Sequence, residues 1–222
     1  SWKDIFPKKG EIHFAGALEN NEDTGTLQYL ASTAMEVGFS TRVLDMQALD
    51  LQNGRFFDPA GELVNRCFKL YPWEWMVDES PDGCLAEMEW LEPIWKLVMS
   101  NKAILATLYE LFPDSPYVLP CYLSRPRSGL FCKKPVFSRE GHNVSVVDIR
   151  DWEEYVRIAE TEGDYNTGAY VYQEYVEPTA YSGRYPVIGS WIIGGEAAGI
   201  GIRENRMEVT DNLSEFVPHI IG

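Results

Sequence analysis

The sequence has few cysteines, and their spacing limits what they do. Only four occur among the 222 residues, and no two of them form a CxxC pair. Zinc sites and thioredoxin-type redox motifs need such closely spaced thiols, so this spacing argues against both. Each cysteine lies in or beside apolar sequence, which predicts buried free thiols in a reducing compartment. The four positions are Cys67, Cys84, Cys121 and Cys132.

Basic residues are also scarce. The chain carries 19 Lys and Arg against 34 Asp and Glu, which gives a formal net charge of −15. Nucleic-acid surfaces need clustered cations, so we expect no nucleic-acid partner. A local basic pocket for a nucleotide remains compatible with this balance. The acidic exterior fits either solubility alone or a cationic partner such as a polyamine.

Long apolar runs and repeats are missing as well. No apolar run is long enough to span a membrane, and the N-terminus SWKDIFPKKGEIHF lacks the apolar stretch of a signal peptide. We therefore expect a cytoplasmic protein with no membrane partner. The start at Ser1 without methionine is compatible with a processed or excised part of a longer protein. The 45% hydrophobic residues predict a sizeable core, in one large or two small domains.

The first part of the chain predicts a β-α-β unit. Glu11–Leu18 has the pattern of a strand, and the polar cluster Glu19–Thr24 is typical of a helix start. Apolar residues at helical spacing follow up to Gly38, and Ser40–Leu44 reads as a second, parallel strand. The loop after the first strand has no glycine-rich fingerprint, which argues against a dinucleotide site there.

Aromatic residues dominate the next stretch. Glu62–Leu70 predicts a strand, and Tyr71–Met76 places three large aromatics beside Glu74 and close to Lys69. A lysine and a glutamate among tryptophans fit either the wall of a site or an ion pair at the edge of an aromatic core. Glu87–Val98 carries apolar residues at helical intervals, interrupted by Pro93, and predicts the end of a first lobe.

A helix is predicted after Ser100 and Asn101. Its inward face is expected to consist of Ala103, Ile104, Leu108 and Leu111, and Pro113 stops it. Lys102 falls in the first turn, where a cation opposes the helix dipole. That placement favours an anion site built from helix amides and a lysine, and a solvated lysine is the less favoured alternative.

The stretch Phe131–Val144, FCKKPVFSREGHNV, predicts a strand, a polar loop and a second strand that runs from Asn143 to Ile149. Pro135 holds Lys134 extended. With Arg139 and Gly141 in its loop, such a hairpin suits an anionic ligand, because glycine lets backbone amides approach phosphate oxygens. An ordinary hairpin with a solvated basic end is the alternative. His142 is a candidate acid–base group.

Three further elements complete the chain. Asp151–Glu162 predicts an exposed helix that packs on the sheet. Ala169–Val176 predicts a strand whose Gln173 and Glu174 could read the edge of a purine, although Gln-Glu at a strand end is common. Residues 185–204 predict a hairpin about Gly194-Gly195-Glu196, with Arg203 near the end of its second strand.

Six phrases in this order resemble the amide-synthetase half of glutathionylspermidine synthase and its acid–amine ligase relatives, which are ATP-grasp enzymes. They are VNRCFKLYPWEW, SNKAILATLYELFP, KKPVFSREGHNV, VYQEYV, IGSWIIGGEAAGIGIRE and TDNLSEFVPHI, and they are distributed along the chain from Val64 to Ile220. The resemblance implies an α/β fold in a partial chain. Residues 1–98 would form a small pre-ATP-grasp domain, and residues 99–222 an ATP-grasp nucleotide-binding part with a phosphate-covering hairpin.

The resemblance also implies an activity and a set of roles. ATP would phosphorylate a small-molecule or peptide carboxylate, and an amine, which could be a polyamine, would then displace phosphate to form an amide. Arg203 would be the catalytic residue that faces the transferring phosphoryl group. Trp73 and Glu74 would form a site wall. The nucleotide would be bound by Lys69, Lys102, Lys134, Ser138, Arg139, Glu140, Gly141, Gln173, Glu174 and Val176.

Within the hairpin, Lys134 rather than Lys133 takes the Lys-Pro position of the family, and His142 has no role that the family requires. The family's Mg²⁺ ligands belong to an Arg-x-Asp and a Glu-x-Asn segment, which we expect upstream of this chain. The chain alone is then expected to lack its metal site. Two alternatives stay open: a non-catalytic or regulatory nucleotide-binding module, and an ATP-grasp member that transfers phosphate to another acceptor.

Overall fold

The computed structural model describes residues 2–151, 155–165, 168–209 and 214–220. The chain divides into two compact units, Ser1–Leu97 and Val98–Gly222, and each is described by itself. Both units combine strands and helices, so the predicted α/β class is confirmed. None of the helices in the described ranges is both long and apolar enough to cross a membrane.

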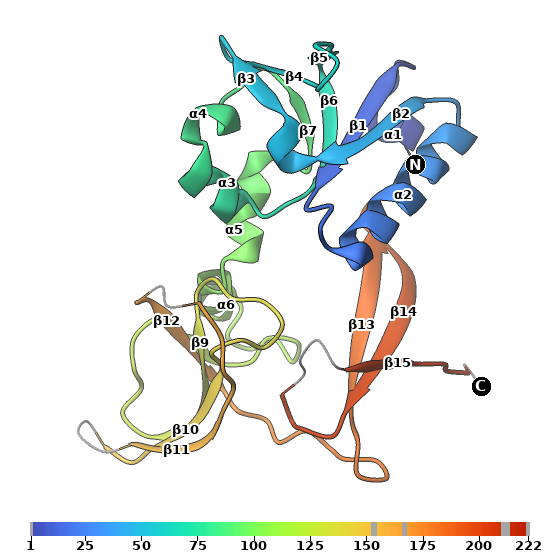
Figure 1. Cartoon of the computed structure of the whole chain (residues 1–222). Helices are drawn as coiled ribbons and strands as arrows, with labels where there is room; N and C mark the ends of the chain where they lie inside the picture. Colours follow the sequence, from blue (N-terminus) through green and yellow to red (C-terminus); the bar gives the residue numbers. More distant parts are fainter. Residues whose placement is uncertain (1, 152–154, 166–167, 210–213, 221–222) are drawn as a thin grey trace. The chain divides into compact units, whose positions relative to one another are not determined.

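A parallel sheet forms the centre of the first unit (Figure 1). Its order is β2-β1-β6-β7, and each neighbouring pair runs parallel. The strands are β1 (Glu11–Gly16), β2 (Ser40–Asp45), β6 (Arg66–Leu70) and β7 (Glu89–Leu91). Helix α2 (Asn21–Glu36) joins β1 to β2, which confirms the predicted β-α-β unit. Asn20 caps this helix by accepting a hydrogen bond from the Glu22 amide at 2.9 Å.

Helices cover both faces of this sheet. On one face, Leu27, Ala31 and Ala34 of α2 pack against Ile12 and Phe14. On the other, α3 (Trp73–Glu79) and α4 (Pro81–Cys84) pack against a second group of buried side chains. That group includes Ala15, Leu44, Phe56 and Cys67. Strands of a parallel sheet are buried on both faces, and β1 is accordingly buried from Ile12 to Gly16.

Two predictions for the end of this unit are wrong in detail. The single strand expected over Glu62–Leu70 is divided into β5 (Leu63–Val64) and β6, which belong to different sheets. The helical interval expected over Glu87–Val98 contains β7, the 3₁₀ helix η2 (Ile94–Lys96) and only one helical turn, α5 (Leu97–Ser100). Trp90 explains the strand, because its ring packs edge-on against both Phe56 and Trp73 while β7 pairs with β6.

The remaining elements of the first unit are short. Helix α1 (Trp2–Ile5) precedes β1, and the 3₁₀ helix η1 (Met46–Ala48) follows β2. Strands β3 (Asp50–Gln52), β4 (Arg55–Phe57) and β5 form a small antiparallel sheet.

An antiparallel sheet of order β11-β10-β9-β12-β8 forms one part of the second unit. Helix α6 (Ala103–Leu111) packs on it through Ala106, which is buried with Cys121 and Val171. The expected inward face of this helix is wrong in part, because Leu111 is exposed. The strands are β8 (Cys121–Tyr122), β9 (Gly129–Pro135), β10 (Ser145–Ile149), β11 (Tyr155–Glu160) and β12 (Tyr170–Glu174).

The predicted hairpin at the centre of this sheet is confirmed. Strands β9 and β10 pair antiparallel, with Lys133 opposite Ser145. The helix expected over Asp151–Glu162 is wrong: residues 155–160 form the edge strand β11, paired with β10, and 152–154 lie outside the described residues. The β-branched Val156 and Ile158 favour a strand once a neighbouring edge is available.

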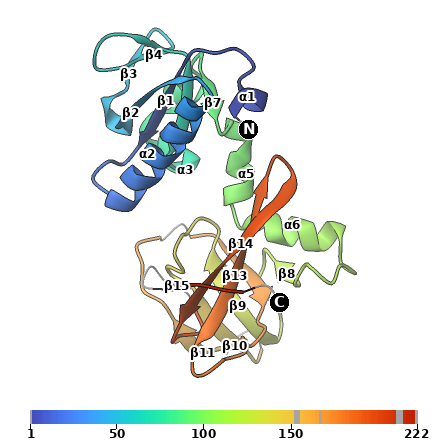
Figure 2. The ribbon, with the colours of Figure 1, turned by 90° about the vertical axis from the view of Figure 1, so that its right-hand side faces the viewer.

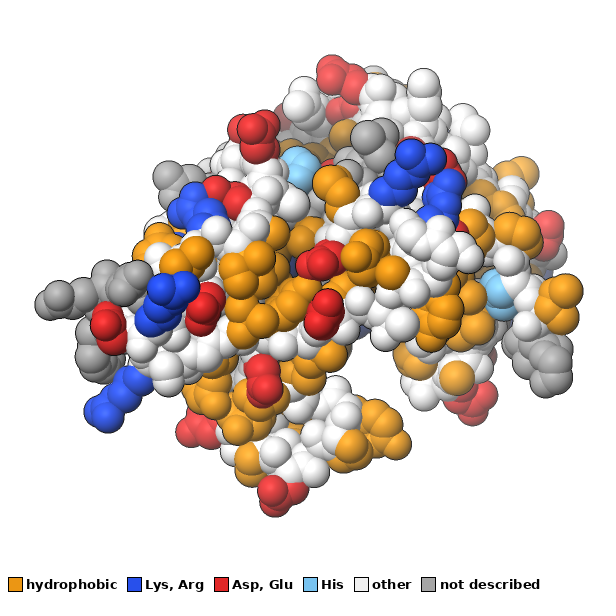
Figure 3. All heavy atoms as spheres, turned by 90° about the horizontal axis from the view of Figure 1, so that it is seen from below, with side chains coloured by type: hydrophobic (Ala, Val, Ile, Leu, Met, Phe, Trp, Pro, Cys, Tyr) orange, Lys and Arg blue, Asp and Glu red, His pale blue; other side chains and the backbone are white. Residues whose placement is uncertain are grey.

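A second antiparallel sheet, β13-β14-β15, completes this unit. Strands β13 (Tyr185–Ile193) and β14 (Glu196–Asn205) form the predicted long hairpin (Figure 2), and β15 is Glu215–Val217. Gly194 and Gly195 both have positive φ in the two-residue turn, as the sequence indicates. Figure 3 shows one face of the molecule, on which hydrophobic side chains reach the surface among acidic ones.

Candidate functional site

A lysine and a glutamine from neighbouring strands meet on one face of the β9–β12 pair. Lys134 lies opposite Val171 in the register of the two strands, and Gln173 is two residues further along. The Nζ atom of Lys134 donates a hydrogen bond to Oε1 of Gln173 at 2.7 Å. Both side chains are half-buried. The structure therefore brings together two of the residues that the sequence predicts at one site.

Lys133 turns to the opposite face of the same strand. Its ammonium lies 3.9 Å from the centre of the Tyr170 ring, and it lines a small apolar cavity with Tyr172 and Ile149. The alternation follows from the strand geometry of β9, in which successive side chains point to opposite faces. The two adjacent lysines therefore cannot serve the same site from this strand.

Lys102 connects the start of α6 to the loop after β9. Its backbone amide donates to the carbonyl of Val136 at 2.7 Å. Its ammonium donates to the Oγ of Ser138 at 2.9 Å and also to the Ser138 carbonyl. Lys102 precedes the first residue of the helix, and the side chain of Asn101 accepts from the Ala103 amide. Lys102 is thus a partner of the loop, which argues against the alternative of a solvated lysine.

The loop itself is a tight polar turn. The His142 amide donates to the Arg139 carbonyl at 2.9 Å. Glu140 and Gly141 have φ of 55° and 73°, and the second of these values favours glycine. The side chains of Arg139 and Glu140 are exposed. His142 stacks edge-on against Tyr165, with ring centres 5.9 Å apart.

Two residues that the sequence analysis did not select hold this loop in place. The hydroxyl of Thr161 donates to the Gly141 carbonyl and accepts from the Val144 amide. Asn143 donates to the Gly163 carbonyl at 2.8 Å, and its Oδ1 accepts from the Tyr165 amide. Asn143 has a positive φ of 54°, which asparagine adopts readily in turns. An asparagine next to the predicted loop is the one feature of the sequence that points to this role.

The other predicted residues of this unit lie apart from that cluster. Glu174 ends β12 and is exposed, and its amide donates to the Pro120 carbonyl. Val176 is also exposed. Arg203 belongs to β14, where its guanidinium lies 5.9 Å from the centre of the Phe216 ring. Among the described residues, no hydrogen bond or ion pair joins Arg203 to Lys134 or Gln173.

Lys69 belongs to the first unit, near the carboxyl end of β6. It is buried, its Nζ donates to the Tyr71 carbonyl at 2.6 Å, and it lies 3.9 Å from the centre of the Trp73 ring. Burial lowers the pKa of Lys69 to about 8, although Cys67, Glu74 and Glu92 act in the opposite direction. Lys69, buried against the Trp73 ring, therefore loses its proton more easily than an exposed lysine does.

Groups of three or more metal-ligating side chains and disulfide-bonded cysteines are both missing from the described residues. No group of three His, Cys, Asp or Glu in the described part of the chain is arranged to hold a metal. The four cysteines are free thiols. Burial raises the pKa of Cys67, Cys84, Cys121 and Cys132, which makes them weak nucleophiles.

A protein-family model described as "Glutathionylspermidine synthase preATP-grasp" matches residues 1–222. The chain belongs to this family. The resemblance found in the sequence is therefore confirmed. Because the model spans both compact units, the division of roles between residues 1–98 and 99–222 stays a prediction.

Curated relatives extend this result. A putative acid–amine ligase of Haemophilus influenzae is 34% identical over 95% of this chain and 56% of its own length. The trypanothione synthetase of Crithidia fasciculata is 28% identical over 93% of this chain and 35% of its own. The bifunctional glutathionylspermidine synthetase/amidase of Escherichia coli is 26% identical over 90% of this chain and 36% of its own length. The chain thus spans about a third to a half of the length of these relatives.

A solved structure shares the fold. The crystal structure of D-cycloserine synthetase DcsG superposes with a TM-score of 0.51 at 15% identity. The match covers 87% of this chain and 68% of that one. At this identity the likeness concerns the arrangement of helices and strands alone.

Proposed function

We propose that this chain is the nucleotide-binding part of an ATP-dependent carboxylate–amine ligase, which forms an amide through an acyl phosphate. The observation that carries the proposal is the pairing of Lys134 with Gln173 on one face of the β9–β12 pair. A cation and an amide fixed side by side suit the phosphates and the base edge of a nucleotide. Membership of a family whose relatives include a putative acid–amine ligase supports the reaction class.

Lys102 and the loop after β9 would complete the phosphate site. The loop, Ser138–Gly141, carries an exposed arginine and turns sharply at two residues with positive φ. Such turns present backbone amides to anions. Lys102 already bonds to Ser138, so the cation and the loop would move together toward a phosphate. Glu174 and Val176 follow Gln173 along the chain and would flank the base.

The proposed reaction has two steps, phosphorylation of the acid and displacement of phosphate by the amine. A carboxylate oxygen of the acid attacks the terminal phosphorus of ATP, and ADP leaves. The amine nitrogen then attacks the acyl carbon, phosphate leaves with that same oxygen, and the nitrogen loses a proton. Positive charge at the phosphoryl group stabilises the first transition state, and Arg203 is our candidate for that role.

Magnesium would neutralise charge on the phosphates in such a ligase. It prefers several oxygen ligands in octahedral geometry. Among the described residues, no group of three His, Cys, Asp or Glu side chains is arranged to hold a metal ion. The relatives are longer than this chain, and we propose that residues outside these 222 supply the ligands.

Isotope transfer tests the proposal directly. The complete protein is incubated with ATP and panels of ¹⁸O-labelled carboxylic acids, including peptides, together with amines that include polyamines. Mass spectrometry then follows both the amide product and the released phosphate. We expect one ¹⁸O atom in phosphate for each amide formed.

Amide without label in phosphate would exclude an acyl phosphate. ATP binding without any product would favour a non-catalytic nucleotide-binding module.

A further inference from the structure

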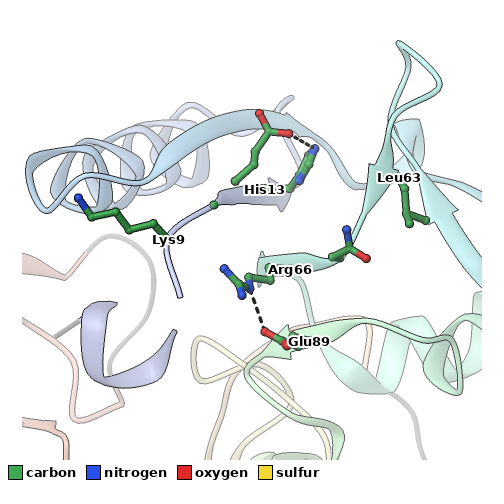
Figure 4. A pocket seen from close by; sticks show the side chains of 8 residues that line it. Lys9, His13, Leu63, Arg66 and Glu89 are labelled. Atoms are coloured by element: carbon green, nitrogen blue, oxygen red, sulfur yellow. Dashed lines mark hydrogen bonds and ion pairs between the residues drawn. The ribbon is translucent and has the colours of Figure 1, made fainter. Parts of the chain in front are cut away.

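Two charged side chains that line a polar pocket of the first unit already pair with other side chains of the protein (Figure 4). Arg66 pairs with Glu89 at 3.0 Å, and Glu11 accepts from Arg42 at 2.9 Å. Both ring nitrogens of His13 are buried and lack a hydrogen-bond partner within the described residues. The charges of these two pairs are thus balanced within the protein, without a ligand.

In the second unit, the segment that follows β11 holds the loop after β9. The backbone amide of Thr161 donates to the Val144 carbonyl at 2.9 Å. The Thr161 hydroxyl accepts from the Val144 amide at 3.0 Å and donates to the Gly141 carbonyl. One residue therefore fixes the backbone on both sides of His142 and Asn143.

Asn143 joins the same two segments from the side of the loop. Its Nδ2 donates to the Gly163 carbonyl at 2.8 Å, and its Oδ1 accepts from the Tyr165 amide at 2.8 Å. Both ends of this side-chain amide are thus bonded to the backbone of residues 163–165. The loop is held by directed polar bonds, which depend on the position of each partner more strictly than apolar contacts do.

Gly163 lies too close to the loop for any larger residue. A Cβ atom at this position would lie 2.4 Å from the Cβ atom of His142 and 2.9 Å from Oδ1 of Asn143. Since packed atoms cannot overlap to this extent, an alanine would push the two segments apart. The close approach is the reason for glycine here, because the φ of Gly163 lies outside the positive range.

The part of the loop that these contacts hold faces solvent with polar groups. At its start, Lys102 donates to the hydroxyl of Ser138 at 2.9 Å. The side chains of Arg139 and Glu140 are exposed. The amide of Gly141 has no hydrogen-bond partner within the described residues. An ordered turn with an open amide and an exposed arginine suits an anion.

We propose that Thr161, Asn143 and Gly163 are positioning residues for the phosphates of the nucleotide. They act through the loop, which they hold in the shape that receives the phosphates before ATP arrives. A loop that is already ordered loses less conformational freedom on binding, so part of the ATP affinity depends on these contacts. This inference rests on the proposed nucleotide site and adds to it a group of residues from outside the loop.

ATP and adenosine together distinguish positioning from general destabilisation, because adenosine has no phosphate. Binding to the complete protein is measured by isothermal titration calorimetry for ATP, and by displacement of a fluorescent ATP analogue for adenosine. Thr161→Val keeps the shape of the side chain and removes its hydroxyl. It should weaken ATP binding about fivefold or more and adenosine binding less than about twofold. Thr161→Ser keeps the hydroxyl and should bind ATP within about twofold of the unaltered protein.

Gly163→Ala is the second variant, and it should weaken ATP binding with the same selectivity. Adding His142→Gly removes the Cβ atom that the alanine meets, so the double variant should recover about twofold or more of the lost affinity. Gly25→Ala is the matched control, because a Cβ atom there meets nothing within 4 Å. It should leave the binding of both ligands unchanged.

The possible failures are distinguishable. An unaltered protein that does not bind ATP would overturn the nucleotide site and this inference together. ATP binding that Thr161→Val and Gly163→Ala leave intact, or equal losses of ATP and adenosine binding, would overturn the positioning role alone.

Discussion

The Nζ atom of Lys134 donates to Oε1 of Gln173 at 2.7 Å, across two antiparallel strands and 39 positions of sequence. Lys133, its neighbour in the chain, lies against the Tyr170 ring on the other face. Strand β9 therefore places Lys134 on the polar face and Lys133 in the small apolar cavity on the other face. A substitution of Lys133 can serve as the matched control for a substitution of Lys134.

Lys102→Ala should loosen the loop after β9. The variant removes the two hydrogen bonds that its ammonium makes to Ser138, so local opening becomes easier. Arg139 is exposed in that loop, and trypsin cleaves after arginine. We expect trypsin to cut the Arg139–Glu140 bond several-fold faster than in the unaltered protein. Cleavage is followed by mass spectrometry.

Lys133→Ala is the control for this experiment, because Lys133 makes no bond to the loop. ATP should slow cleavage of the unaltered protein and have less effect on the Lys102 variant. Equal cleavage rates with and without Lys102 would show that its bonds to Ser138 do not hold the loop.

Lys69→Met should change how stability depends on pH. The pKa of Lys69 is about 8 in the folded protein and 10.5 ordinarily. Between these values the unfolded chain holds a proton that the folded chain lacks, so stability rises with pH. Measured by urea unfolding, the stability of the unaltered protein relative to Lys69→Met should increase from pH 8 to pH 10.

Direct titration provides the second readout for Lys69. An amine resonance that is missing from the Met variant should titrate near pH 8. A midpoint near the ordinary value of 10.5, together with a pH-independent stability difference, would contradict the burial argument.

Asp58→Asn should weaken the first unit in a pH-dependent way. Asp58 is buried, and its carboxylate accepts from the amides of Ala60 and Glu62 and pairs with Arg42. Hydrogen bonds from the backbone amides of Glu62 and Ala60, together with the guanidinium of Arg42, lower the pKa of Asp58 below its usual 3.8. The stabilisation is therefore complete above pH 3.8 and is lost as the pH falls through the folded pKa.

Thermal melts at several pH values test this expectation. The unaltered protein should melt higher than Asp58→Asn at pH 6, and the gap should close as the pH falls below 3.8. Asp50→Asn, at an exposed strand position, should show no such gap. A gap that is constant with pH would mean that shape rather than charge makes Asp58 important.

Local patterns explain which parts of the fold were predictable. The β1-α2-β2 unit carries its own cap at Asn20 and its own stop at Gly38, and the β13–β14 turn carries two glycines. These signals lie within a few residues of the structure that they determine. Asp151–Glu162 has an apolar spacing that fits a helix or a strand. Residues 155–160 form a strand because they pair with the edge of β10, which lies outside this segment.

The candidate site divides in the same way. Lys134 and its face follow from the strand alternation around Pro135. The bond from Lys102 to Ser138 spans 36 positions, and that from Thr161 to Gly141 spans 20, so neither has a local signal. The sequence also contains no sign that the ring nitrogens of the buried His13 in β1 lack hydrogen-bond partners within the described residues. The neighbours of this ring, Asp58 and Arg42, come from other parts of the first unit.

ATP affinity measured by isothermal titration calorimetry tests the central claim most directly, in the unaltered protein, Lys134→Ala and Lys133→Ala. A hydrogen bond to a charged group contributes roughly 1.5–3 kcal/mol, so Lys134→Ala should weaken ATP binding about 10- to 100-fold. Lys133→Ala should change it by less than about twofold, since that side chain lies on the other face. Equal losses in both variants, or a loss only in Lys133→Ala, would contradict a nucleotide site on the Lys134 face.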